Sequence, residues 1–150
     1  MDKTVMCYLK KNDTYLLLYR NKKENDLNEG KYIGIGGHIE EGESKEEALV
    51  REVKEETNLD LLSYRYCGEV LFVNNDYQEI MYIYYSDDFT GELSECNEGT
   101  LTFVKEEDIY SLNMWEGDKL FLPYVLKESK SFKMKIIYED KTLKDYEVLI

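Results

Sequence analysis

Three glutamates in the first half of the chain are spaced so that a helix would bring their carboxylates together. Glu52, Glu55 and Glu56 are related as i, i+3 and i+4, the spacing of residues on one face of an α-helix. Like charges at this spacing repel each other by roughly a few tenths of a kcal/mol per pair. Such a face is either a solvated acidic surface or a site where a cation relieves the repulsion, and the three residues alone leave both interpretations open.

Two features beside the glutamates favour the cation site. Gly36 and its neighbouring glycines precede the helix, and glycine permits backbone conformations that turn carbonyl oxygens toward a bound ion. Arg51 lies next to Glu52 and four residues before Glu55, where it could hold a carboxylate in a fixed orientation. Carboxylate and carbonyl oxygens are the hard ligands that magnesium and manganese prefer. The cluster therefore predicts a site for Mg²⁺, which Mn²⁺ could also occupy.

The surrounding sequence predicts the elements that would position this cluster. Ser44 and Glu47 form a capping box, so a helix is expected from Lys45 to about Asn58. A second helix is expected at Asp118–Lys127, and polar loops at Asn21–Lys31 and Asp87–Gly99. Apolar, tyrosine-rich or alternating runs predict strands at Thr4–Leu9, Tyr15–Arg20, Leu62–Asn74, Tyr77–Ser86, Thr100–Val104, Phe132–Tyr138 and Thr142–Leu149. Mixed strands with two principal helices predict an α+β layered domain that ends in a β-hairpin.

Length and charge limit the class of protein. The 150 residues suit one domain, 1–150, since no repeat, linker or break in composition divides them. With 19 basic and 32 acidic residues the net charge is −13, which argues against binding of a nucleic-acid polymer. A phosphorylated ligand would therefore need a divalent cation as a bridge. No signal peptide or membrane-spanning apolar run is found, so we expect a cytoplasmic protein without a membrane partner. The three distant cysteines are expected to be reduced thiols, and the single histidine, His38, has no assigned role.

The glutamate cluster and its flanks resemble the Nudix box. The pattern runs as Gly37, five residues, Glu43, seven residues, Arg51-Glu52-Val53, one residue, Glu55-Glu56, one residue and Asn58-Leu59. Chance is a poor explanation for so many fixed positions. The family usually has glycine in place of Asn58, and asparagine is the next-best residue for a left-handed helix end. We expect this departure to change stability slightly and chemistry little.

The resemblance implies a Nudix α/β/α sandwich with a mixed sheet, and magnesium-dependent hydrolysis of a nucleoside diphosphate linked to a further group. The implied metal ligands are Glu52, Glu55, Glu56 and the Gly36 carbonyl. By the same matching of positions, Arg51 would orient the glutamates and Glu43 would support the loop through a structural bond. Glu52 is the first choice for taking the proton of the attacking water, and Glu98 is a competitor.

Beyond the box the chain resembles the MutT and human-type 8-oxo-dGTP diphosphatases, in nearly co-linear order. Lys22-Lys23 and the run Gly30–Gly37 match the entry into the box, and Met114-Trp115 followed by Asp118 matches the base-recognition segment. This resemblance implies that Trp115 stacks on a purine, that Asp118 pairs with the edge of the base, and that Glu98 binds metal. The other positions that would meet the substrate are Lys23, Tyr8, Phe72 and Met81.

Each base-pocket residue also has a purely structural interpretation. Trp115, Phe72 and Met81 could belong to the core, Asp118 could be the first acid of a helix, and Lys23 could be an ordinary loop cation. Tyr8 is larger than the subfamily's residue and would narrow the pocket. Two further positions depart from the subfamily, because Ile33 replaces a base-reading asparagine and Gly117 replaces the first of two aspartates.

The leading hypothesis is a nucleoside triphosphate diphosphatase that acts on 8-oxo-dGTP or a related oxidised purine nucleotide and releases the monophosphate and pyrophosphate. Its partner would be this small nucleotide, and the choice between monomer and homodimer stays open. Three alternatives remain. The chain could hydrolyse another nucleoside diphosphate derivative such as ADP-ribose, sense nucleotides without cleaving them, or be an acidic interaction protein. All acidic positions of the box are present, which favours hydrolysis.

Overall fold

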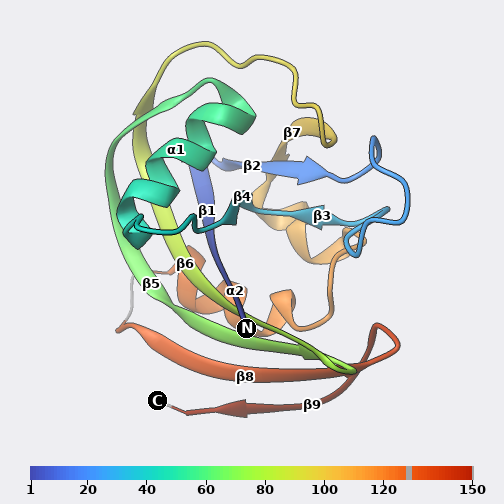
Figure 1. The fold of residues 1–150 in the computed structure, drawn as a ribbon. Helices are drawn as coiled ribbons and strands as arrows, with labels where there is room; N and C mark the ends of the chain where they lie inside the picture. Colours follow the sequence, from blue (N-terminus) through green and yellow to red (C-terminus); the bar gives the residue numbers. More distant parts are fainter. Residues whose placement is uncertain (128–129, 150) are drawn as a thin grey trace.

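A computed structural model describes residues 1–127 and 130–149, and its strands form one mixed sheet (Figure 1). The order along the sheet is β3-β2-β1-β6-β5-β8-β9, while β4 pairs with β1 and β7 with β2. The β1–β6 and β5–β8 pairs are parallel, and the other pairs are antiparallel. The strands are β1 Asp2–Lys11, β2 Thr14–Tyr19, β3 Tyr32–Ile33, β4 Ile35–His38, β5 Asp60–Asn74, β6 Tyr77–Thr90, β7 Thr100–Lys105, β8 Phe132–Glu139 and β9 Thr142–Val148. The helices are α1 Lys45–Thr57, the 3₁₀ helix η1 Glu106–Ser111 and α2 Asp118–Leu126.

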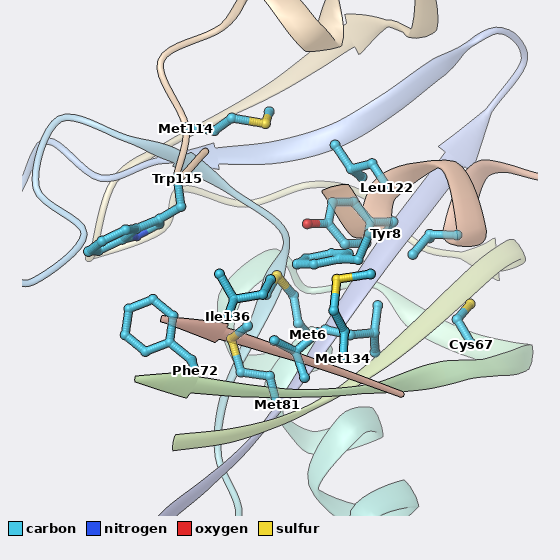
Figure 2. Packing of buried hydrophobic residues seen from close by; sticks show 14 of the residues in the cluster. Met6, Tyr8, Cys67, Phe72, Met81, Met114, Trp115, Leu122, Met134 and Ile136 are labelled. Atoms are coloured by element: carbon cyan, nitrogen blue, oxygen red, sulfur yellow. The ribbon is translucent and has the colours of Figure 1, made fainter. Parts of the chain in front are cut away.

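Two apolar clusters lie on opposite faces of the sheet. Successive side chains of a strand point to opposite faces, so Val5 and Cys7 of β1 pack in one cluster with Leu49 of α1. Tyr8, one position further along β1, packs in the other cluster, where Figure 2 shows it near Leu122 of α2. Its ring also lies edge-on against Phe121 of α2. Helices on both faces explain why β1 is apolar at consecutive positions. The predicted α+β sandwich is therefore confirmed.

Helix α1 begins and ends where its sequence predicts. The Ser44 side chain accepts a hydrogen bond from the Glu47 amide at 3.1 Å, and the Glu47 carboxylate accepts one from the Ser44 amide at 2.9 Å. Asn58 has a φ of 68° and donates its backbone N–H to the Lys54 carbonyl at 2.9 Å. The capping box and the left-handed end are both confirmed. They set where the helix begins and ends, while the packing of Leu49 and Val53 against the sheet orients the glutamate face.

The second half of the chain follows the predicted elements to within two residues at most of their ends, with η1 as an unpredicted addition and one larger difference in length. Strand β6 continues to Thr90, although Asp87–Gly99 was expected to be a loop. The extra residues pair with the start of β5, where Asp60 lies opposite Thr90. Charged side chains can be exposed there while the backbone pairs, which a polar composition does not reveal. No helix in the described part of the chain is both long and apolar enough to cross a membrane.

Part of the glycine run before α1 lies in a strand, β4, which the sequence analysis did not predict. Strand β4 pairs with β1, and Gly36 lies opposite Met6. Gly36 does not have a positive φ, so its conformation is open to other residues. A Cβ atom at Gly36 would lie 1.8 Å from the Val5 carbonyl oxygen. Close approach of two backbones, and not a glycine-specific conformation, therefore requires glycine at this position.

Candidate active site

A cleft of about 390 Å³ lies along β4 and the adjoining face of β1, and its two ends differ in chemistry. One end is acidic and lies against the glycines of β4. It is lined by Gly36, Gly37, Glu40, Glu52, Glu56 and Glu98. The other end is largely apolar. It is lined by Met6, Leu27, Ile33, Phe72, Met81 and Trp115, with Asp118 and Glu79 among them.

Glu56 is the most deeply placed carboxyl of the acidic end, with 7% of the residue exposed. Burial raises its pKa to about 9, and the neighbouring Glu98 and Glu52 add to this shift. The Gly36 amide opposes the shift by donating a hydrogen bond to Glu56 Oε2 at 3.2 Å. Burial also raises the pKa of Glu52. This end of the cleft therefore gathers more negative charge than it can stabilise without a cation.

Arg51 links the acidic end to the loop before α1. Its Nε and Nη2 donate to the two oxygens of Glu43 at 2.7 and 2.9 Å, and its Nη1 donates to Glu52 Oε1 at 2.9 Å. A weaker bond of 3.2 Å reaches Glu55 Oε2, and Nη2 also donates to the His38 carbonyl at 3.1 Å. The bonds from Arg51 hold the pKa of Glu43 at about 2. This geometry is the one expected of an arginine that orients carboxylates and of a glutamate that supports the loop.

The predicted metal ligands are only partly gathered. Glu52, Glu56 and Glu98 line the cleft, whereas Glu55 lies outside it, with 59% of its side chain exposed. Across residues 1–127 and 130–149, no three acidic, histidine or cysteine side chains already surround a common point. The available donors are nevertheless hard carboxylate oxygens gathered at one end of the cleft, and this chemistry suits Mg²⁺ or Mn²⁺. A bound cation would have to draw these side chains together.

Trp115 both lines the cleft and belongs to the core. Only 3% of it is exposed, and its ring packs edge-on against Phe72 at 5.0 Å and against Tyr138 at 4.8 Å. The indole Nε1 donates to Asn28 Oδ1 at 2.7 Å, and Lys31 Nζ lies 5.0 Å from the ring centroid. Figure 2 shows Trp115 and Phe72 at one end of the apolar cluster. Trp115 therefore belongs to the core and also forms part of the cleft wall, and the same holds for Phe72 and Met81.

Asp118 lies at the start of α2 and also lines the cleft, with 5% of the residue exposed. Burial raises the pKa of its carboxyl to about 7, while the positive charge of Lys31 opposes this shift. Lys23 lines the cleft as well, and its Nζ lies 3.8 Å from Glu98 Oε1. Tyr8 does not line the cleft. It is 2% exposed and packs against Phe121, because its position on β1 directs the side chain into the core beneath α2.

The sequence analysis did not single out several residues that line this cleft. Arg20, at the end of the second predicted strand, donates from Nε to Asp26 Oδ2 at 2.7 Å and approaches Glu98 Oε2 at 3.5 Å. Glu79 lines the apolar end and accepts two hydrogen bonds. Its spacing of two residues from Met81 places both side chains on one face of a strand. That spacing was the available signal for Glu79.

The chain belongs to the Nudix family, since residues 2–125 match the model of the NUDIX domain. Nudix hydrolases act on small nucleotide substrates and generally use divalent cations. The chain is 29% identical over 133 residues to the uncharacterized Nudix hydrolase YvcI of Bacillus subtilis, covering 85% of this chain and 80% of that protein. It is also 29% identical over 110 residues to the oxidized purine nucleoside triphosphate hydrolase of Danio rerio, covering 72% of this chain and 70% of that protein.

A solved structure supports the same fold. The MutT protein of Bacillus halodurans superimposes with a TM-score of 0.90 at 24% identity, over 99% of this chain and 98% of that one. This likeness confirms the predicted Nudix fold, and the family match supports the predicted class of enzyme, a Nudix hydrolase.

Proposed function

We propose that the protein hydrolyses a purine nucleoside triphosphate, with 8-oxo-dGTP as the leading substrate, to the monophosphate and pyrophosphate with Mg²⁺ as cofactor. The observation that carries this proposal is one continuous cleft with an acidic end and an aromatic end. A triphosphate chain bridged by a cation would suit the first end, and a purine ring would suit the second. The likeness to the oxidized purine nucleoside triphosphate hydrolase of Danio rerio supports the same substrate class.

At the acidic end, Glu52, Glu56 and Glu98 would hold the cation, together with the Gly36 carbonyl. Glu55 would join them after its side chain turns away from Arg51. When bound, such a cation neutralises phosphate charge and lowers the pKa of a bound water. Glu52 would accept the proton of the attacking water, while Arg51 holds that carboxylate in place through the 2.9 Å bond from its Nη1.

Two cations of the protein face the same end of the cleft. Arg20 and Lys23 both line it, next to Glu98. Once Glu98 turns toward a bound ion, each would be released to contact a phosphate oxygen. At the other end, Phe72, Met81 and Trp115 would enclose the purine, and Asp118 would accept a hydrogen bond from its edge. Stacking of this kind contributes roughly 1–3 kcal/mol per base.

The test is turnover of a matched panel of 8-oxo-dGTP, dGTP, dATP, a dinucleoside polyphosphate and ADP-ribose, with and without Mg²⁺, with products identified by mass. We expect the highest kcat/KM for 8-oxo-dGTP, with pyrophosphate released and no turnover in chelator. A preference for ADP-ribose would retain the Nudix chemistry and refute the triphosphate assignment. Binding of 8-oxo-dGTP without hydrolysis of any compound would instead support a nucleotide-sensing domain.

A further inference from the structure

The apolar end of the cleft contains a carboxylate that the proposed function does not use. Glu79 is half-buried on β6, two residues before Met81, and it pairs across the strands with Phe72. Its side chain therefore shares the face of the sheet on which a purine would lie. Thr4 donates to Glu79 Oε2 at 2.7 Å, and Tyr77 donates to Glu79 Oε1 at 2.6 Å.

These two hydroxyl groups hold the Glu79 carboxylate in place and leave part of its hydrogen-bonding capacity unused. No ion pair joins Glu79 to a lysine or arginine within residues 1–127 and 130–149. An ionised carboxylate offers about four acceptor positions, of which the two hydroxyl groups occupy two. Placing a carboxylate next to Phe72 and Met81 is costly unless its hydrogen bonds are completed. The remaining acceptor capacity lies on the cleft wall, where a ligand donor can reach it.

Asp118 gives independent evidence that a hydrogen-bond donor is missing from this end of the cleft. The residue is 95% buried, and its carboxylate accepts no hydrogen bond from any residue that the structure describes. Among the described residues, every fully buried side-chain oxygen has a hydrogen-bond partner. The Asp118 oxygens have none, so they must keep a small exposed area, which faces the cleft that this residue lines. Asp118 and Glu79 both line the apolar end of the cleft, and the charge of Glu79 adds to the effect of burial in raising the pKa of Asp118.

Most of the donors at this end are already committed within the protein; the exception is the Asn28 amide, whose Oδ1 accepts a hydrogen bond while its Nδ2 donates none among the described residues. The hydroxyls of Thr4 and Tyr77 donate to Glu79, and the indole N–H of Trp115 donates to Asn28. Of the polar groups left for a ligand, the two carboxyls of Glu79 and Asp118 are acceptors when ionised. A base that fits must present several N–H groups. The edge of guanine does so through N1–H and the 2-amino group, whereas hypoxanthine lacks the amino group and adenine has an acceptor at N1.

We propose that Glu79 is a specificity-determining residue that acts with Asp118 as an acceptor pair and selects guanine-type bases, including 8-oxoguanine. The proposal deepens the function proposed above, since it assumes that the cleft binds a purine nucleotide. It also accounts for Ile33 and Gly117, which stand where the subfamily has base-reading side chains, because Glu79 on β6 supplies the second acceptor.

The test is equilibrium binding of two monophosphates in chelator, measured by calorimetry. Deoxyguanosine monophosphate is compared with deoxyinosine monophosphate, which differs only by the 2-amino group. We expect the wild-type chain to prefer the guanine compound by about 10- to 100-fold. In Glu79→Gln this ratio should fall to within about threefold, with the affinity for the inosine compound nearly unchanged. The matched control is Glu69→Gln, since Glu69 pairs with Lys133 at 3.3 Å and does not line the cleft, and it should keep the full ratio.

An unchanged ratio in Glu79→Gln would overturn the proposal. An equal loss of affinity for both compounds would also overturn it, because that result would place Glu79 against the sugar. Glu79→Asp withdraws the carboxylate by one methylene while keeping its charge, and it should lower the ratio too if Glu79→Gln folds poorly. Since binding in chelator requires no turnover, a failure to hydrolyse 8-oxo-dGTP would count against the proposed function without deciding the role of Glu79.

Discussion

Alanine substitutions at the adjacent glycines Gly36 and Gly37 should fail in different ways, one in folding and the other in catalysis. Gly36 packs directly against the backbone of β1. A Cβ atom there would lie 1.8 Å from the Val5 oxygen, 2.7 Å from the Val5 carbonyl carbon and 2.9 Å from the Met6 Cα. Backbone atoms of a central strand cannot rotate away, so β4 would have to separate from β1. We expect Gly36→Ala to lower the free energy of unfolding by about 3 kcal/mol or more.

At Gly37 the nearest atoms belong to the flexible end of a side chain. A Cβ atom would lie 2.5 Å from Glu52 Oε2, 2.6 Å from its Cδ and 2.8 Å from its Oε1. The Glu52 carboxylate can turn aside, so the free energy of unfolding should fall by only about 1 kcal/mol. In turning, it leaves the position held by Arg51, and a displacement of about 1 Å in a catalytic group can lower turnover by roughly 100-fold.

Urea unfolding and Mg²⁺-dependent turnover of 8-oxo-dGTP, measured on both variants, separate the two effects. The account predicts a folded and nearly inactive Gly37→Ala, and a strongly destabilised Gly36→Ala. Wild-type turnover in Gly37→Ala would refute the assignment of Glu52 as a catalytic carboxylate that must keep its position. Wild-type stability in Gly36→Ala would refute the argument that close backbone approach requires glycine there.

Three further predictions concern pH, the helix end and the cation. The Asp118 pKa rises from 3.8 in the unfolded chain to about 7 in the fold, so the native state keeps a proton that the unfolded state has lost. The free energy of unfolding should therefore fall between about pH 4 and 7, by up to about 4 kcal/mol at roughly 1.4 kcal/mol per pH unit. Urea unfolding of Asp118→Asn should lack this part of the pH dependence, and parallel pH dependences of variant and wild type would contradict the prediction. Asn58→Ala should lower the free energy of unfolding by about 1–2 kcal/mol in the same assay, because it loses the left-handed preference of asparagine and the 3.0 Å bond to the Glu92 carbonyl. Asn58→Gly should be nearly neutral, since glycine adopts the left-handed conformation readily, and equal losses in the two variants would contradict this prediction. Mg²⁺ at 100 times its Kd should stabilise the fold by about 2.7 kcal/mol in thermal unfolding, and no shift would argue against a metal site.

The sequence predicted most of the elements because their signals are local. The capping box at Ser44 and Glu47 and the αL asparagine at Asn58 involve residues that are neighbours in the chain, and the structure has both. The helix spacing of Glu52 and Glu56 likewise predicted that they share a face, and both line the cleft.

The remaining features depend on residues far apart in the chain. Strand β4 was missed because the reason for its glycines lies in the backbone of β1, which a local pattern does not include. Tyr8 was placed in the pocket by matching of positions, yet the alternation of β1 directs it into the core beneath α2. The role proposed for Glu79 depends on the pairing of β6 with β1, which brings Thr4 to its carboxylate, and with β5, which places Phe72 opposite it.

The central claim is that the glutamates of the acidic end support metal-dependent hydrolysis. Its most direct test compares the turnover of 8-oxo-dGTP by Glu56→Gln and by the wild type across a Mg²⁺ titration. Because the pKa of Glu56 is about 9 without metal, neutral glutamine resembles the form present at neutral pH and should leave the fold intact. The exposed Glu41, outside the cleft, provides the matched control Glu41→Gln. The account predicts turnover in the wild type and the control, and its loss in Glu56→Gln at every Mg²⁺ concentration. Wild-type turnover by Glu56→Gln would contradict the account.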